Sequence, residues 1–136
     1  MSLRVANDHG ITKALRLRGT ARVDERTKRL ALRILPGEIA IINHLDLDLP
    51  TTQALIARKP AAVINALPSI SGRFPNQGPG LLLEQGIPLI DDAGPEIMEA
   101  VSDGDEVEIA DGSIFVGKRL VGRGEVLTPA SLDEKM

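Results

Sequence analysis

The stretch AAVINALPSISGRFPNQGPGLLLEQGIPLIDD, Ala61 to Asp92, decides the fold of this chain. Its apolar start (61–65) is typical of a buried strand, and the following segment (68–79) is dense in Gly, Pro, Ser and Asn, as loops are. A helical run (80–86) and a second apolar strand (87–92) come next. This order predicts a parallel strand pair with the polar loop at a carboxyl end, where α/β proteins place ligand sites.

Strands and helices alternate along the rest of the chain, which predicts a mixed α/β fold with more than one β layer. We expect a flexible arm over 1–17, one domain over 18–127, and over 128–136 the start of a helix that leads to a domain outside this chain. Further predicted strands cover 18–25, 38–42 and 120–127, a hairpin with a type I′ turn at Asp111-Gly112 covers 106–116, and helices cover 27–35, 50–59, 95–101 and the end from Thr128.

Composition narrows the classes of function. The 136 residues contain no cysteine, which excludes thiolate chemistry and disulfides, and two histidines, so any metal site would depend on carboxylates. Only two residues are aromatic and the net charge is −3, which argues against nucleic-acid binding. No apolar run is long enough to span a bilayer and no signal peptide is evident, so we expect a cytoplasmic protein that is not an integral membrane protein.

Charge is distributed unevenly along the chain. Residues 1–33 carry nine basic and three acidic side chains, whereas residues 84–117 carry ten acidic side chains and no basic one. Two solvated faces would explain this pattern. A second interpretation is that the basic segment from Arg22 to Arg33 contacts anionic lipid or an acidic partner.

The polar loop offers the first group of candidate site residues. Hydroxyls, an amide, a guanidinium and free backbone N–H groups ahead of a helix that starts near Pro79 could bind a small anion, a phosphate or a carboxylate. Alternatively, the Ser and Asn side chains satisfy backbone groups within the loop, and Arg73 pairs with an aspartate of the next strand. The candidate ligand-binding residues are Asn65, Ser69, Ser71, Arg73, Asn76, Asp91 and Asp92.

Only one carboxylate of Asp91-Asp92 can face the loop, because adjacent residues of a strand point to opposite faces. His44 and Asp46 are secondary candidates. If the chain stays extended after the strand 38–42, His44, Asp46 and Asp48 share a side and could bind a metal, but an amphipathic segment without metal has the same pattern. We therefore predict no metal site, no cofactor and no catalytic residue. The loop lacks the Lys and the Ser or Thr of a P-loop, and no nucleophile elbow accompanies His44.

The segment LLLEQGIPLIDDAGPEIMEAVSDGDEVEIADGSIF resembles the mobile swivelling domain of phosphotransferases that use phosphoenolpyruvate. This resemblance implies a three-layer β/β/α swivelling-domain-like fold. In that family a histidine early in the helix carries the phosphoryl group, and the corresponding position here is Gln77, which cannot form a phosphoramidate. The resemblance therefore favours the fold and argues against the family's chemistry.

A broader resemblance covers the chain from Gly19 onward. The segments GTARVDERTKRL, LPGEIAIINHLDLD, INALPSISGRFPNQGP, GIPLIDDAGPEI and GEVLTPASL are similar to the N-terminal domain of SteA-like cytokinetic-ring proteins of actinobacteria. That resemblance implies a role in cell division and daughter-cell separation. It also implies a membrane-bound division partner protein, recruitment to the division site, and a C-terminal domain similar to thiamin pyrophosphokinase. It implies no reaction for the present domain.

Two hypotheses follow. The leading one is a noncatalytic binding or docking domain whose loop binds an anionic group or the neighbouring domain. The alternative is a component of an enzyme that handles phosphorylated small molecules, by phosphoryl transfer or in a thiamin pyrophosphokinase-like reaction. In that alternative Arg73 clamps a phosphate beside Asp91, Asp92 or His44. A separate and less favoured hypothesis is that His44 itself is phosphorylated.

Overall fold

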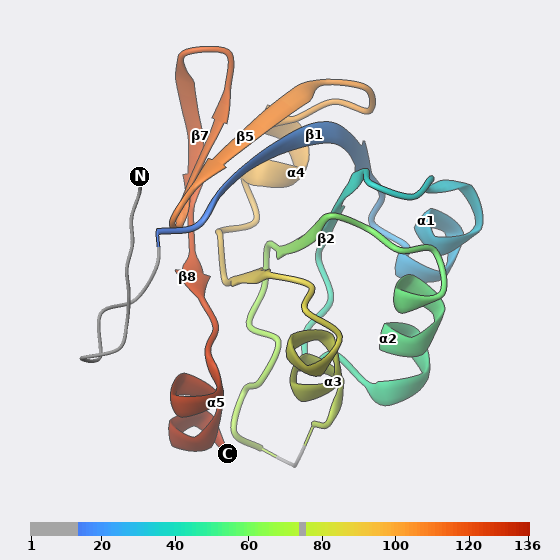
Figure 1. The fold of residues 1–136 in the computed structure, drawn as a ribbon, viewed down its shortest axis with the longest axis vertical. Coiled ribbons are helices and arrows are strands. Elements are labelled where there is room, and N and C mark those ends of the chain that lie inside the picture. The colour runs from blue at the N-terminus through green and yellow to red at the C-terminus, as the bar shows by residue number, and fades with distance from the viewer. Residues whose placement is uncertain (1–13, 74–75) are drawn as a thin grey trace.

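The computed structural model describes residues 14–73 and 76–136. Expectations about the arm before residue 14 lie outside these residues. The elements follow the predicted order, with five short helices among eight strands (Figure 1). They are β1 (Arg16–Val23), α1 (Thr27–Arg33), β2 (Ile39–Ile42), α2 (Leu49–Ile56), β3 (Ala62–Asn65), α3 (Gly78–Glu84), β4 (Leu89–Asp91), α4 (Ile97–Ala100), β5 (Glu106–Ala110), β6 (Ser113–Val116), β7 (Arg119–Arg123), β8 (Glu125–Val126) and α5 (Pro129–Lys135).

All eight strands join one mixed sheet in the order β7-β6-β5-β1-β2-β3-β4-β8. Strands β1 to β4 are parallel and lie side by side in chain order, which confirms the parallel pairing of β3 with β4. Strand β5 pairs antiparallel with β1, β6 with β5 and β7 with β6, and β8 pairs antiparallel with β4. The mixed α/β class predicted from the sequence is therefore confirmed.

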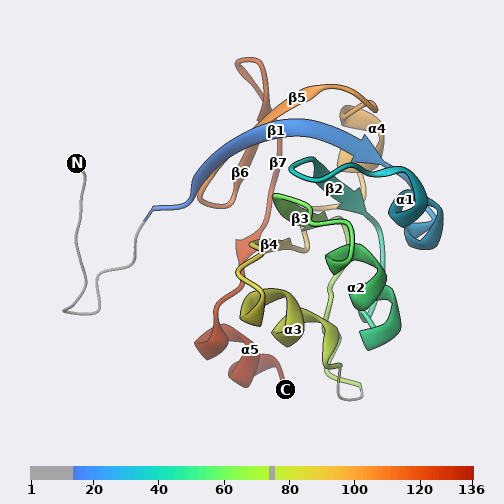
Figure 2. The same ribbon diagram turned by 45° about the vertical axis from the view of Figure 1, so that its right-hand side comes forward.

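The parallel strands carry an aliphatic core on each face. On one face, Ala40, Ile42 and Val63 pack with buried side chains of the helices such as Leu30 and Leu55. Helices α1, α2 and α3 follow one another along this face, with α5 beside α3 (Figure 2). Because both faces are covered, β2, β3 and β4 are buried along their whole length, whereas β1 alternates.

The opposite face is covered by the antiparallel strands and by α4. Ile39, Ile41 and Ile64 belong to one cluster with Val107 of β5, and Ile97 of α4 joins the same cluster. Strand β1 is long enough to pair with β2 through its C-terminal half and with β5 through its N-terminal half. The sheet bends at β1. The antiparallel strands that follow β5 therefore lie over the face of β2 and β3 that carries this cluster.

Helix boundaries follow the local chemistry that the sequence predicts. The Asp48 carboxylate caps α2 by accepting from Thr51 N at 2.8 Å, and a proline occupies the first turn. Thr128 caps α5 in the same way, reciprocated by Ser131. These two caps confirm the predicted starts of both helices.

Two predicted element boundaries differ from the structure. Strand β1 begins at Arg16, so Arg16 and Leu17 belong to the sheet and not to an arm. The predicted strand 120–127 is split between β7 and β8, which pair with different neighbours. The split occurs at Gly124, whose N–H donates to Gly112 O at 2.8 Å.

The type I′ turn is also wrong. Asp111 has a φ of 53°, but Gly112 does not adopt a positive φ. A Cβ atom at Gly112 would collide with the carbonyl oxygen of Gly124. A glycine is therefore needed at 112 for a close backbone approach rather than for its torsion angle.

Candidate functional site

Polar side chains follow each of the four parallel strands at their carboxyl edge. Asp24 follows β1, His44 follows β2, Asn65 ends β3 and Asp91 ends β4. Parallel strands end at the same edge of a sheet, so residues far apart in sequence come together there. This edge contains nearly all of the candidate residues that the sequence predicts.

Asn65 joins the ends of the two central strands. Its side chain is fully buried, accepts from His44 N at 2.9 Å and donates to His44 O at 2.8 Å. The amide nitrogen also lies 2.7 Å from Ser69 Oγ. Asn65 thus continues the hydrogen bonding of the sheet beyond β3 and fixes the start of the polar loop.

Asp46 holds the far half of the loop. Its carboxylate accepts from Ser71 N at 2.7 Å, from Ser71 Oγ at 3.0 Å and from Asn76 Nδ2 at 2.9 Å. The Ser71 amide is the main reason that the pKa of Asp46 is lowered below its usual value. The donors expected to bind an external anion therefore bind a carboxylate of the protein itself.

Arg73 lies on the exposed part of the loop. Among the residues that the structure describes, it forms no ion pair with Asp91 or Asp92, and the carboxylate whose pKa it lowers is Asp46. The pairing of Arg73 with Asp91 or Asp92, considered from the sequence, is not observed. Among the described residues, its guanidinium forms no hydrogen bond or ion pair.

Only one of Asp91 and Asp92 faces the loop, as predicted, although Asp92 lies beyond the end of β4. Asp91 is buried and accepts from Ser69 N at 2.9 Å, and burial raises the pKa of its carboxyl. Asp92 is exposed and adopts a left-handed conformation with a φ of 54°. Only Asp91 belongs to the loop network, and its role there is to anchor the backbone at Ser69.

The extended arrangement considered for His44, Asp46 and Asp48 is wrong. The chain turns at Asp46, whose φ is 57°, so Asp46 points to the loop while His44 lies between Thr27 and Asp48. His44 Nδ1 is 2.9 Å from Thr27 Oγ1, and Nε2 is 3.3 Å from Asp48 Oδ2. Within 14–73 and 76–136, no cluster of three potential metal ligands occurs.

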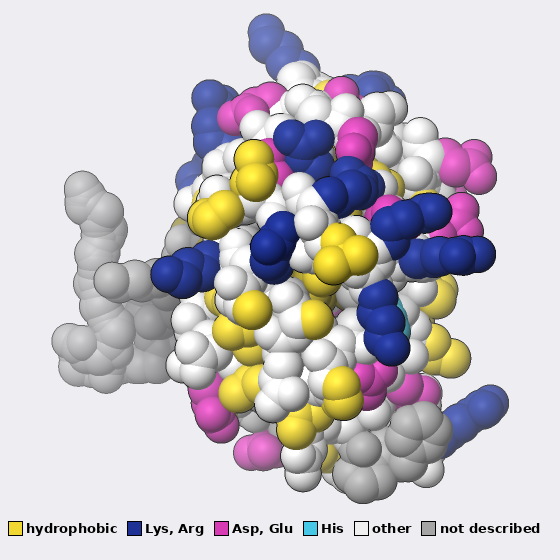
Figure 3. Space-filling model, turned by 90° about the vertical axis from the view of Figure 1, so that its right-hand side faces the viewer, with side chains coloured by type: hydrophobic (Ala, Val, Ile, Leu, Met, Phe, Trp, Pro, Cys, Tyr) yellow, Lys and Arg dark blue, Asp and Glu magenta, His cyan; other side chains and the backbone are white. Residues whose placement is uncertain are grey.

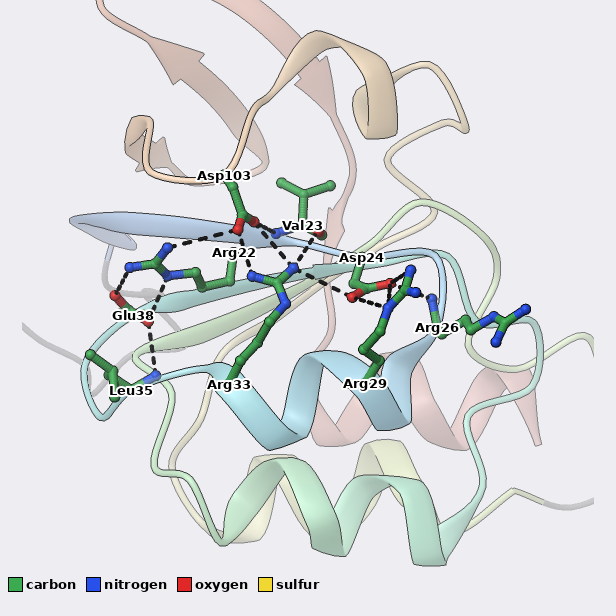
Figure 4. Close-up of polar contacts among 9 residues, drawn as sticks. All are labelled: Arg22, Val23, Asp24, Arg26, Arg29, Arg33, Leu35, Glu38 and Asp103. Atoms are coloured by element: carbon green, nitrogen blue, oxygen red, sulfur yellow. Dashed lines mark hydrogen bonds and ion pairs between the residues drawn. The ribbon is translucent and has the colours of Figure 1, made fainter.

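A second polar cluster lies where β1 ends, and the sequence does not predict it as a site (Figure 4). Arg29 donates through Nε and Nη2 to the buried Asp24, and Arg33 reaches Asp24, Asp103 and the Val23 carbonyl. The hydrogen bonds from Arg29 are the main cause that lowers the pKa of Asp24 to about 2. The cluster fastens α1 to β1 and to the turn before β5.

Arg22 extends the same cluster at its other end. Its guanidinium forms a two-point contact with Glu38 at 3.0 and 2.9 Å and also lies 3.7 Å from Asp103. An open polar cavity of about 460 Å³ adjoins the cluster; it is lined by Val23, Asp24, Glu25, Arg29, Arg33, Met98 and Asp103. Arg29 and Arg33, which line this cavity, already form ion pairs with carboxylates of the protein. Their charges therefore stabilise the fold.

The signal for this cluster is present in the sequence but incomplete. The density of basic residues between 22 and 33 is visible, whereas Asp103 lies far away in the chain. Its contact with Arg33 depends on the bend of the sheet at β1. Pattern analysis of single segments does not predict such a contact.

Neither the protein-family models nor the curated proteins compared with this chain match it. In the part of the chain that the structure describes, no helix has both the length and the apolar character needed to cross a bilayer.

Proposed function

We propose that this chain is a noncatalytic docking domain of a cytoplasmic cell-division protein that is recruited to the division site at the membrane. The polar loop after β3 would contact the protein's own C-terminal domain or a membrane-bound division partner. The cell-division context rests on the resemblance to SteA-like proteins, and the docking role rests on the geometry of the loop.

The observation that carries the docking role is the contact of Asp46 with Ser71 and Asn76. An internal carboxylate that uses three loop donors fixes the loop without any ligand. A preformed loop loses little conformational entropy when a partner binds, which is what a docking surface requires. Arg73 is exposed on this loop and is the residue best placed to contact an acidic group of the partner.

The enzymatic alternative has less support. It requires Arg73 to hold a phosphate near the aspartates of β4, but Asp91 is buried and directed to Ser69 N. Asp46, Ser71 and Asn76 already satisfy one another. These side chains fasten the loop, and none of them is left as a free acid or base beside Arg73.

We also infer that the bent sheet corresponds to a three-layer β/β/α arrangement of the swivelling-domain type. It is supported by the two aliphatic cores, one beneath the helices and one beneath the antiparallel strands. A crystal structure in which β5 to β7 extend away from β1 and leave the second core uncovered would contradict this inference.

A fluorescent fusion in the natural host tests the cell-division role. We expect the fusion to concentrate at the division site, and Arg73→Ala to reduce this recruitment while the melting temperature of the purified chain is unchanged. Lys118→Ala, which removes an exposed base on the opposite part of the sheet, is the matched control. A diffuse fusion, or equal recruitment of the Arg73→Ala variant, would contradict the proposal.

A further inference from the structure

The C-terminal end of α1 exposes two leucines next to basic side chains. Leu32 is 79% exposed and Leu35 is 55% exposed. Lys28 is one helical turn before Leu32 and on the same face of α1. We call Lys28, Leu32, Leu35, Arg58 and Lys59 the Leu32 patch.

The end of α2 brings the other two bases to this patch. Arg58 Nη2 donates to Leu32 O at 2.8 Å, and Lys59 O accepts from Gly37 N at 2.9 Å. Both contacts place the C-terminal end of α2 beside the C-terminal end of α1. The corresponding face of the molecule shows basic side chains spread among hydrophobic ones (Figure 3).

The Leu32 patch contains no acidic side chain, and two nearby acids are already neutralised. Asp24 is paired with Arg29 and Arg33, and Glu38 is paired with Arg22. Lys28 and Lys59 form no ion pair among the residues that the structure describes. The basic segment noted in the sequence is therefore divided: its paired arginines stabilise the fold, whereas Lys28 faces solvent, as Lys59 at the end of α2 does.

We propose that the Leu32 patch binds the surface of an anionic lipid membrane. Its leucines do not line the cavity beside Asp24, and they protrude from the end of a helix. Protruding apolar side chains flanked by bases suit the boundary between lipid headgroups and acyl chains, where the leucines insert and the bases meet anionic headgroups. Two leucines give weak, reversible binding, and the contribution of the bases to that binding decreases with salt.

The position of the patch separates it from the docking loop. The patch lies where α1 and α2 end and lead into β2 and β3, at the amino edge of the parallel strands. The polar loop lies at the carboxyl edge. A membrane and a docking partner could therefore be bound at opposite ends of the same helical layer, and the membrane proposal does not depend on the docking function.

Co-sedimentation of the full chain with lipid vesicles tests this proposal. The vesicles are phosphatidylcholine alone or phosphatidylcholine mixed with phosphatidylserine, at low salt and at about 0.15 M salt. We expect binding only to the mixed vesicles, weakened at the higher salt. The double variant Lys28→Gln/Lys59→Gln should bind on the order of twenty-fold more weakly. Leu32→Gln/Leu35→Gln should bind at least about ten-fold more weakly.

Two surface variants on the hairpin strands serve as matched controls. Lys118→Gln removes an exposed base, and Leu120→Gln replaces an exposed leucine, and both should bind like the unmodified chain. The proposal would be overturned if the unmodified chain did not bind the mixed vesicles. It would also be overturned if Leu32→Gln/Leu35→Gln bound them as tightly as the unmodified chain does. The unmodified chain could instead bind poly-glutamate but no vesicles, with the poly-glutamate binding lost in the same variants. That result would show that the patch binds an acidic protein and not a membrane.

Discussion

The Asp46 carboxylate holds Ser71 at two points, with the Ser71 amide 2.7 Å from one oxygen and the Ser71 hydroxyl 3.0 Å from the other. The two residues are separated by 25 positions in the chain. This contact closes the polar loop onto the segment that follows β2. It makes Asp46 a structural part of the loop, although the loop sequence alone does not contain it.

Asp46→Asn should loosen the loop. The amide that replaces the carboxylate has only one acceptor oxygen, so either the Ser71 hydroxyl, or the Ser71 and Asn76 N–H groups that share the other oxygen, lose their acceptor. We expect faster hydrogen exchange at the Ser71 amide, measured by mass spectrometry or NMR. Asp92→Asn is the matched control, because Asp92 has nearly the same left-handed φ but is exposed. Equal exchange in both variants would show that Asp46 does not order the loop.

Asp24 should stabilise the fold except in strong acid. Its pKa is lowered from 3.8 to about 2 by hydrogen bonds from Arg29. The folded state therefore holds this proton less tightly than the unfolded state, so the stabilisation is complete above about pH 4 and is lost as the pH falls towards 2. At neutral pH, Asp24→Asn should lower the free energy of unfolding by about 1 to 2 kcal/mol.

Urea unfolding from neutral pH to acid measures this effect. Glu25→Gln is the control, because it removes an adjacent carboxylate that is exposed. We expect the Asp24→Asn and unmodified curves to converge at low pH. Curves that stay parallel through the acid range would rule out the proposed origin of the stabilisation.

Asp91 should have the opposite pH dependence. Burial raises the pKa of its carboxyl, so the folded state holds the proton more tightly than the unfolded state does. The free energy of unfolding should then fall as the pH rises from about 4 through this raised pKa. Asp91→Asn keeps an oxygen for Ser69 N and should remove this fall. If the free energy of unfolding had the same slope against pH in the unmodified protein and in Asp91→Asn, the raised pKa of Asp91 would be contradicted.

The tight packing at Gly124 gives a direct test of the sheet. A Cβ atom there would lie 2.5 Å from Asp91 O and 2.8 Å from Ile90 Cγ2. Gly124→Ala should therefore destabilise the fold by about 1 to 3 kcal/mol or more. Gly80→Ala, in α3, has open space around the new methyl group and should be neutral or stabilising by up to about 1 kcal/mol. Equal melting temperatures for Gly124→Ala and Gly80→Ala would contradict the path of the chain between β7 and β8.

The local elements could be predicted from the sequence because their signals are local. The side chains of Asp48 and Thr128 cap the helices that follow them. The apolar run at 61–65 predicts a buried strand from its own residues. Strand alternation predicts that only one of Asp91 and Asp92 faces the loop, although in the structure β4 ends at Asp91 and Asp92 turns away in a left-handed conformation. These features need no knowledge of long-range contacts.

The partners of the candidate site residues could not be predicted in this way. Asp46 leaves the extended path because its left-handed conformation turns it towards Ser71, a contact between distant segments. Likewise, the Arg33 contact with Asp103 exists only because the sheet bends at β1. The sequence therefore predicts a polar loop after β3, and the fold determines that Ser71 and Asn76 of this loop donate to Asp46.

The central claim is that the loop after β3 docks another protein surface through Arg73. The most direct measurement places a photo-crosslinking amino acid at Gln77, which is exposed beside the loop, in the natural host. We predict a discrete crosslinked product that contains the C-terminal domain or a membrane-bound division protein, and that disappears with Arg73→Ala but persists with Lys118→Ala. No product at Gln77, or the same product in the Arg73→Ala variant, would contradict the claim.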